Sequence, residues 1–423
     1  MSFLQGYQGY QGYQGYQGYQ GYQGYQGYQG YGGGGAVSLG PGVDPSVAYA
    51  LMTTQQDLTG LAQKLVDWHP ARLLTTRTSD ALPLGGEARA AFGWGVDIRL
   101  ENAVTELTQP IRMRLSGKGN SCEFVAFHDE ERLPIFSLVR PPIELFKKQL
   151  KSVQQHIDLR PERMAEIVNQ IGLPWQFWAS ILDLNPTDHG YTLELLNVAL
   201  AGLSHVNQYA KHNLACPRPA NYSPGIQPII NPRRFGAFPS GHAAEAFLIA
   251  RLLQQISGQL STETYGSPTV DLDLQRLAGR IADNRVVAGV HFPVDSSAGR
   301  LVGESFAEYF LFRCQANECT LGWIARKFRG DLLMEKDKAP VLDFNVFDPL
   351  SAKSYPSWPS YFQKSELGKI GGLPEVYCPT KKNGEQVTVP EFERTSILRA
   401  LYLRASAEWK NNTGWLADRG VSQ

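Results

Sequence analysis

The sequence predicts a mainly α-helical fold, because apolar residues recur at helical spacing through much of the chain between residues 141 and 312. Leucines stand three or four positions apart between residues 193 and 203, and an apolar helical run extends from Ala243 to Ile256. Prolines precede or open several of these segments, as Pro161 does, and proline suits the first turn of a helix. We therefore expect a helix bundle.

The overall composition excludes some classes of protein. The 423 residues suit one large domain or two of medium size, and acidic and basic residues balance at 40 each, so no positive excess points to nucleic acid. No apolar run reaches the roughly 18 residues of a membrane-spanning helix, and we expect a soluble protein. The number of cysteines is odd, and their spacings match no zinc pattern. Cys216 is expected to be a small buried residue, and Cys314 and Cys319 either pair or stay reduced. The cysteines are Cys122, Cys216, Cys314, Cys319 and Cys378.

Residues 1–35 differ from the rest of the chain, because Gln-Gly-Tyr repeats without error from Gln5 to Tyr31 and a run of glycines follows. The segment has neither the charged nor the apolar region of a signal peptide, and it indicates no compartment. One interpretation is a disordered low-complexity tail. The other is self-assembly, as a helix with three residues per turn or as stacked strands with Gln ladders. Residues 5–31 would then join copies of the protein into a homo-oligomer or a fibre.

The regions on either side of the predicted bundle carry no clear catalytic motif. Residues 36–140 are expected to form a mixed lead-in or cap, with a helix between 45 and 68 and many β-forming residues after 70. The stretch Phe127–Glu131 (FHDEE) resembles a cluster of metal ligands, but an exposed acidic turn is the preferred interpretation. Residues 313–423 are expected to wrap the bundle or mediate subunit contacts, irregular at first and ending in a helix near 395–409.

Three short clusters between Lys211 and Asp295 carry the chemistry of the chain. The first places Lys211 near the end of a helix, since Pro217 and Pro219 stop that helix soon afterwards, and it leaves Arg218 in the following loop. Lysine supplies a compact charge, and arginine supplies a planar fork that can grip two oxygens. These residue types predict a site for a tetrahedral oxyanion. The clusters read KHNLACPRP, AFPSGHAAEAF and NRVVAGVHFPVD.

The second cluster predicts a helix N-terminus that faces this anion. Ser240 is expected to cap the helix that follows, and the Gly241 N–H would point at negative charge that the helix dipole also favours. Glycine lets the backbone come close to a ligand. His242 lies at the same helix N-terminus and could move a proton at near-neutral pH.

The third cluster ends one helix and starts another. Helical apolar spacing continues to about Arg285, and Gly289 interrupts it. His291 and Asp295 are four residues apart, so we expect them to share a face of the next helix if it starts there. A carboxylate on one ring nitrogen would fix the tautomer of His291 and leave the other nitrogen as a nucleophile or ligand.

The motifs Lys-x6-Arg-Pro, Pro-Ser-Gly-His and Arg-x5-His-x3-Asp resemble the signature of a superfamily. It includes type 2 phosphatidic acid phosphatases, bacterial class A acid phosphatases and vanadium-dependent haloperoxidases. The resemblance implies an all-α helix-bundle fold, with residues 141–312 as the catalytic core. Asn284 departs from the pattern, since many members have serine there; asparagine can still donate a hydrogen bond.

The same resemblance assigns roles to the cluster residues. It implies that His242 is the acid/base, that His291 is the phosphate acceptor or the vanadate ligand, and that Asp295 orients His291. Phe235 stands where fungal chloroperoxidases have an aromatic residue on the halide side of the pocket, and it is a candidate for the halide site; the alternative is a loop residue packed over the site. The expected oxyanion contacts are Lys211, Arg218, Ser240, Gly241 and Arg285.

Three functions fit these observations. A vanadium haloperoxidase would use peroxide and halide at a vanadate on His291, and a phosphatase would use a phosphate ester and form a phosphohistidine at His291. Because vanadate mimics the phosphoryl transition state, the same residues serve both, and fold analogy alone decides nothing. The haloperoxidase is preferred, since no membrane helix is expected and the chain is much longer than the minimal acid phosphatases. The third function is a filament-type protein whose repeats assemble and carry this domain.

Overall fold

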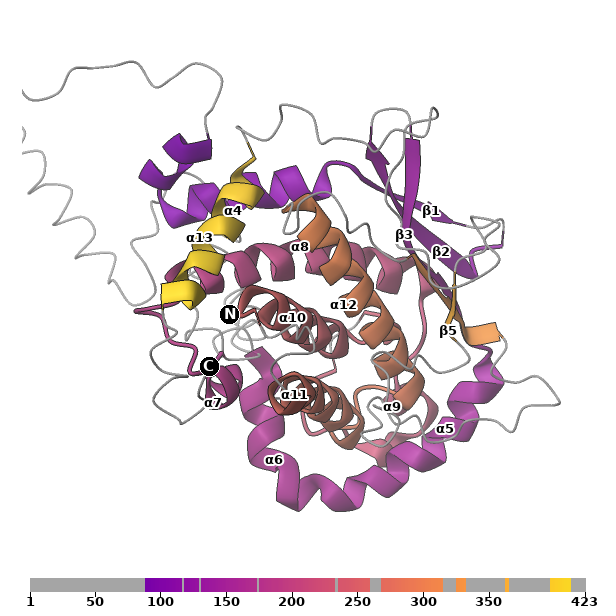
Figure 1. Ribbon diagram of the computed structural model, residues 1–423. Coiled ribbons are helices and arrows are strands. Elements are labelled where there is room, and N and C mark those ends of the chain that lie inside the picture. Colours follow the sequence, from indigo (N-terminus) through magenta and orange to yellow (C-terminus); the bar gives the residue numbers. More distant parts are fainter. Residues whose placement is uncertain are drawn as a thin grey trace, which may run out of the picture.

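The computed structural model describes residues 88–115, 118–128, 131–172, 175–232, 235–258, 268–314, 325–331, 362–364 and 396–411. The expectations for the repeat at 1–35 and for the helix at 45–68 lie outside these residues, and so does most of the irregular part expected between residue 313 and the final helix. In the described part the fold is mainly α-helical with one small sheet, which confirms the predicted fold class (Figure 1). The helices are α4 (Val96–Thr108), α5 (Ile143–His156), α6 (Arg160–Asn169), α7 (Gln176–Leu182), α8 (Gly190–Leu214), α9 (Pro219–Tyr222), α10 (Gly241–Ile256), α11 (Pro268–Val287), α12 (Pro293–Arg313) and α13 (Ile397–Asn411).

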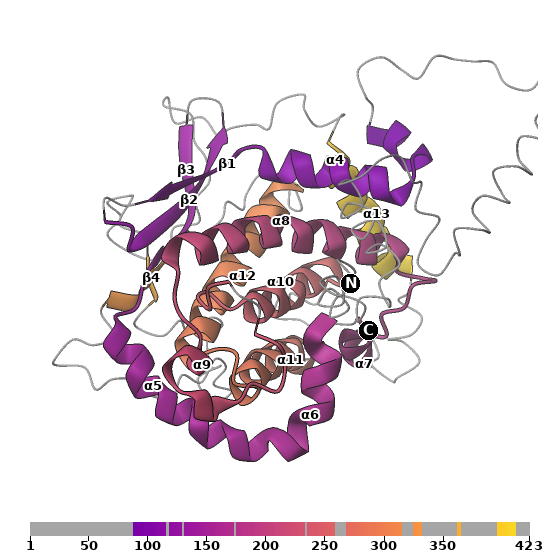
Figure 2. The same cartoon turned by 180° about the vertical axis from the view of Figure 1, so that it is seen from behind.

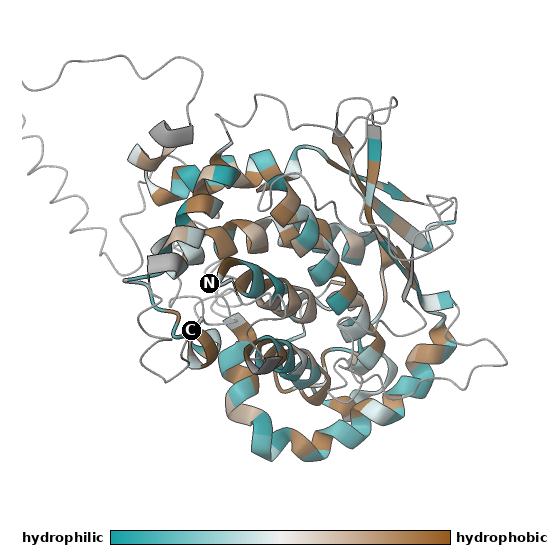
Figure 3. Cartoon of the chain, viewed as in Figure 1, coloured by the Kyte–Doolittle hydropathy of each residue, from teal (hydrophilic) through white to brown (hydrophobic). Residues whose placement is uncertain are grey.

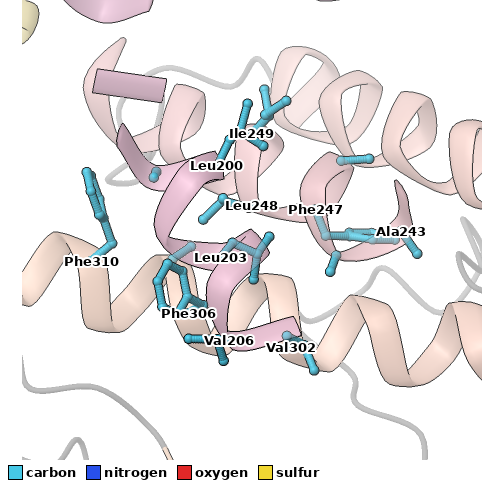
Figure 4. Packing of buried hydrophobic residues seen from close by; sticks show 14 of the residues in the cluster. Leu200, Leu203, Val206, Ala243, Phe247, Leu248, Ile249, Val302, Phe306 and Phe310 are labelled. Carbon is cyan, nitrogen blue, oxygen red and sulfur yellow. The ribbon is translucent and has the colours of Figure 1, made fainter. Parts of the chain in front are cut away.

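Helices α8, α10 and α12 form the centre of the bundle. Their apolar faces meet in one buried cluster, where Leu203 of α8, Leu248 of α10 and Phe306 of α12 are fully buried (Figure 4). Figure 2 shows α10 and α11 in the middle of the molecule, with α8 on one side and α5 and α6 on the other. Hydrophobic and hydrophilic residues alternate along α5 and α6, as expected for helices with one face in the core (Figure 3).

Two glycines allow α10 and α12 to pack with their backbones in contact. A Cβ added at Gly299 would lie 2.6 Å from the carbonyl oxygen of Ser240, and one added at Gly303 would overlap the carbonyl of Ala244. The start of α10 is therefore held directly against α12.

A five-stranded sheet, in the order β1-β2-β3-β4-β5, lies beside the bundle (Figure 1). The β-forming residues of the lead-in supply the first three strands as antiparallel neighbours, and β4 pairs parallel with β3. His128 of β2 pairs with Glu131 of β3 in the antiparallel register, and Asp129 and Glu130, where an acidic turn was expected, lie outside the described residues. The strands are β1 (Ile111–Leu115), β2 (Ser121–His128), β3 (Glu131–Val139), β4 (Arg326–Arg329) and β5 (Phe362–Lys364).

The ends of the described chain are fixed to the bundle by buried polar contacts. Arg99 of α4 forms a two-pronged pair with Glu194 of α8, at 2.6 and 2.7 Å. Glu408 of α13 accepts hydrogen bonds from the Tyr191 and Thr192 backbone N–H groups at the start of α8. The contacts of Glu408 satisfy N–H groups that the first turn of a helix leaves without a partner. Among the described residues, no helix has the length and apolar character needed to cross a membrane.

Candidate active site

The structure brings the three sequence clusters together at one end of the bundle. Lys211 lies in the last turn of α8, and its Nζ donates to the carbonyl of Ala237, just before α10, at 3.0 Å. Arg218 follows α8 and donates from Nη1 to the carbonyl of Val290 in the loop between α11 and α12, at 2.7 Å. The Ser240 N–H donates to the carbonyl of Asp295 at 2.9 Å. Each cluster is thus hydrogen-bonded to the other two.

The start of α10 matches the expectation from the sequence. Ser240 is the N-cap residue, and its hydroxyl accepts from the Ala243 N–H at 3.4 Å. Gly241 is the first residue of the helix, and a Cβ placed there would lie 4.0 Å from Cε of Lys211. The N-terminus of α10, with its positive dipole end, therefore lies next to the lysine side chain.

The geometry of His291 and Asp295 corrects one expectation. Helix α12 begins at Pro293, so His291 precedes the helix and the two residues do not share a helix face. Instead Asp295 is the third residue of α12, where its Oδ2 accepts the N–H of Phe292 at 2.8 Å and faces Nδ1 of His291 at 3.2 Å. The Asp–His pair forms because the carboxylate caps its own helix and the histidine folds back onto it. Nδ1 is then the protonated nitrogen, by assignment from this contact, and Nε2 carries the lone pair.

Arg285 is a buried cation whose hydrogen-bonding groups are only partly satisfied. Its side chain is fully buried near the end of α11, and Nη2 donates to the carbonyl of Ile167 and to Oε1 of Gln170, both at 3.2 Å. Nε and Nη1 are buried with no hydrogen-bond partner. A buried guanidinium with unpaired N–H groups is costly unless an anion accepts from them. The residues present therefore fit a bound oxyanion such as phosphate or vanadate.

The shifted pKa values of the site residues favour a bound anion. Burial, together with the nearby charge of Arg218, lowers the pKa of Lys211 to about 7, and burial lowers the pKa of Arg285 to about 10. Burial and the surrounding cations hold the pKa of His291 well below its usual value, so the ring is neutral. Burial raises the pKa of Asp295 to about 7. A bound anion would favour the charged forms of the lysine and the arginine.

A fourth segment, residues 167–171 at the end of α6 and the start of the short helix that follows it, completes the site and was missed by sequence reasoning. Besides the contacts of Ile167 and Gln170 with Arg285, the carbonyl of Ile171 lies 3.1 Å from Nε2 of His242. Asn284, expected as a hydrogen-bond donor, gives its Nδ2 to Gln170 at 2.8 Å and to Glu166 at 2.9 Å. Backbone carbonyls carry no residue signature, so only the polar side chain of Gln170 could have drawn attention to this segment.

Phe235 and Cys216 lie beside the cations. The ring of Phe235 lies 5.4 Å from Nζ of Lys211 and 5.2 Å from the guanidinium carbon of Arg218, so it is packed over the site. Nε of Arg218 also donates to the Phe235 carbonyl at 3.3 Å. Cys216 is buried, and burial raises the pKa of its thiol to about 12, which agrees with a small structural residue and not with a reactive thiol.

Three buried cations, a neutral Asp-paired histidine and a helix N-terminus thus meet at one end of the helix bundle, as the sequence predicts for a tetrahedral-oxyanion site. Residues 192–318 match the family model of the PAP2 superfamily, so this part of the chain is a PAP2 superfamily domain. The matched range runs from the start of α8 to just past α12 and contains all three clusters. A comparison with curated proteins found no match.

Proposed function

We propose that the protein is a vanadium-dependent haloperoxidase, which oxidises halide with hydrogen peroxide at a vanadate bound to His291. The PAP2 superfamily domain supports phosphatase-type or haloperoxidase-type chemistry in general. Burial carries the finer choice. Arg285 and Ser240 are 0% exposed, Lys211 1% and His291 4%. Such an enclosed site favours a small inorganic oxyanion and peroxide over an ester with a bulky alcohol.

The residues that would hold vanadate divide into a ligand and a charge cradle. Nε2 of His291 has the free lone pair, because Nδ1 faces Asp295, and it is the ligand in this proposal. Lys211, Arg218 and Arg285 would neutralise the oxygens, with the hydroxyl of Ser240 and the Gly241 N–H as further donors. When bound, vanadate supplies the Lewis acidity that activates hydrogen peroxide toward attack by halide.

His242 is placed to handle the proton of peroxide. Its Nε2 faces a backbone carbonyl, that of Ile171, which can only accept a hydrogen bond. The hydrogen of the neutral ring is therefore on Nε2, and Nδ1 has the lone pair that can take a proton. His242 is partly exposed, unlike His291, so it can exchange that proton with solvent.

Phe235 is the candidate for the halide side of the site. Lys211 and Arg218 lie over its partly exposed ring, and an aromatic ring beside two cations offers a weakly hydrated place for a halide ion. This placement supports the role that the resemblance implies.

A phosphatase is the second candidate, and the neutral His291 favours it. Nε2 of His291 would attack phosphorus, the bond from phosphorus to the ester oxygen would break, and His242, protonated on Nδ1 at the start of this reaction, would give that proton to the leaving oxygen. Water would then attack the phosphohistidine, with His242 as base, and release phosphate. The same residues perform both reactions, so the decision rests on activity.

Paired assays on one preparation test the proposal. One half is loaded with vanadate and given peroxide, bromide and a phenol dye; the other half is kept free of vanadate and given an aryl phosphate. We expect dye bromination that His291→Ala abolishes and that Gln275→Met, a change at a buried glutamine in α11 remote from the clusters, leaves intact. Phosphate release without bromination would replace the haloperoxidase by the phosphatase.

A further inference from the structure

Gln170 has contacts that fix the orientation of its carboxamide. It belongs to the short helix Gln170–Gly172 and is fully buried. Its Oε1 accepts from Nδ2 of Asn284 at 2.8 Å and from Nη2 of Arg285 at 3.2 Å. Both neighbours can only donate from these atoms, so the oxygen must face them and the nitrogen must point to the other side.

The nitrogen of this carboxamide has no acceptor. Nε2 of Gln170 is buried without a hydrogen-bond partner, and so are Nε and Nη1 of Arg285. Two side chains in contact with each other therefore hold three unpaired N–H-bearing atoms in a buried place. Each buried donor that stays unsatisfied destabilises the protein, because it has given up its hydrogen bond with water. A tetrahedral anion offers acceptors in several directions, so it is the kind of ligand that can accept from both side chains.

We propose that Gln170 is a further ligand of the oxyanion, donating a hydrogen bond from Nε2 beside Arg285 while its Oε1 holds Arg285 and Asn284 in place. This assignment rests on the proposed oxyanion site and adds a residue from outside the three clusters. A glutamine serves both purposes because its amide orients the guanidinium without neutralising it. A carboxylate at this position would bind Arg285 equally well but would repel the anion.

Asn284 and, through it, Glu166 hold Gln170 in this orientation by further hydrogen bonds. Asn284 donates to Oε1 of Gln170 and also to Glu166, which itself holds Arg280 through two hydrogen bonds at 2.6 and 2.9 Å. Oδ1 of Asn284 accepts from Nη1 of Arg163 at 3.3 Å. The asparagine that departs from the usual motif is thus the partner that fixes the glutamine.

The test measures anion binding to the whole protein without peroxide or halide. Inorganic phosphate and vanadate are titrated calorimetrically into the wild type, Gln170→Met and Gln170→Glu. Methionine removes both the donor Nε2 and the acceptor Oε1 and leaves Arg285 its contact with the Ile167 carbonyl. Glutamate keeps the acceptor Oε1 and replaces the donor by a second, negatively charged oxygen. We expect Gln170→Met to bind both anions at least about tenfold more weakly, and Gln170→Glu more weakly still.

Two further readouts separate a donor from a residue that only supports the fold. Gln275 is another buried glutamine on the helix that carries Arg285, and its Nε2 donates to Oε1 of Gln254 at 3.4 Å. The variant Gln275→Met should bind phosphate with unchanged affinity. In amide NMR spectra, the side-chain NH2 signal that disappears in Gln170→Met should shift when phosphate is added to the wild type. Melting temperatures of the anion-free variants check that each is folded, and Gln170→Glu keeps the test open if Gln170→Met is not.

The proposal is overturned if Gln170→Met binds phosphate and vanadate like the wild type, or if the Gln170 amide signal does not respond to phosphate. Failure of the haloperoxidase assignment gives a different result. In that case bromination is absent, but Gln170→Met still weakens phosphate binding, and the same donor serves a phosphatase.

Discussion

Replacing Arg285 by methionine should leave the anion-free protein at least as stable as the wild type while removing most of its affinity for phosphate or vanadate. The reason is that the guanidinium is fully buried, with Nε and Nη1 unpaired. Without an anion, this charge is a burden on the fold. With one, it provides two more charge-assisted hydrogen bonds.

The magnitude follows from those two bonds. Hydrogen bonds to charged groups contribute about 1.5–3 kcal/mol each, so losing two costs about 3–6 kcal/mol of binding free energy. This corresponds to roughly a 100-fold to 10,000-fold loss of affinity. Replacing a buried charge by a well-packed apolar side chain is neutral or stabilises a fold by about 1–4 kcal/mol. The two effects have opposite signs.

The assay is thermal unfolding with and without phosphate, and Arg99→Met is the matched control. Arg99 is also buried, but its guanidinium is paired with Glu194 and with the carbonyls of Ala91 and Trp94. Removing it leaves Glu194 buried without its counterion, which destabilises a fold by about 3–5 kcal/mol. Arg99→Met should therefore melt lower yet keep the rise in melting temperature that phosphate produces, whereas Arg285→Met should lose that rise.

The reasoning is refuted if Arg285→Met melts as low as Arg99→Met and phosphate still raises its melting temperature. Arg285 would then be an ordinary structural arginine, and the unpaired nitrogens would not mark an anion site.

The remaining predictions concern protons, helix packing and halide. The pKa of Lys211 is lowered to about 7 in the folded protein and lies near 10.5 in the unfolded chain, so the unfolded chain binds more protons between these pH values and the free energy of unfolding should rise with pH there. At about one pH unit above 7, phosphate binding should be accompanied by uptake of a proton, measured by calorimetry in two buffers. Lys211→Met should abolish this uptake. Gly299→Ala should push α12 away from Ser240, lower the melting temperature and weaken phosphate binding, while Gly190→Ala, where a Cβ meets nothing, should not weaken binding. Phe235→Leu should raise the KM for bromide without a comparable change in vanadate affinity, and an unchanged KM would remove Phe235 from the halide site.

Much of the site could be predicted because its side chains are chemically distinctive and lie near helix ends that have clear sequence signals. Ser240 caps α10, Lys211 lies in the last turn of α8, and Gly289, with a φ of 76°, separates α11 from α12. The roles of these residues toward an anion or a proton remain predictions.

Other features depended on contacts between distant segments. His291 and Asp295 meet, but through a fold-back ahead of Pro293 and not along one helix face, since proline at the first helical position sets where α12 starts. The segment 167–171 contributes backbone carbonyls to the site, and any residue type supplies these. The parallel pairing of β4 with β3 joins segments far apart in the chain, and no local pattern specifies such a partner.

The most direct test of the central claim is a crystal structure of the protein grown with vanadate. We expect vanadium density within bonding distance of Nε2 of His291, with its oxygens in hydrogen-bond reach of Lys211, Arg218, Arg285 and the start of α10. Density at any other place, or none beside His291 while vanadate is bound in solution, would contradict the oxyanion site from which every functional proposal here follows.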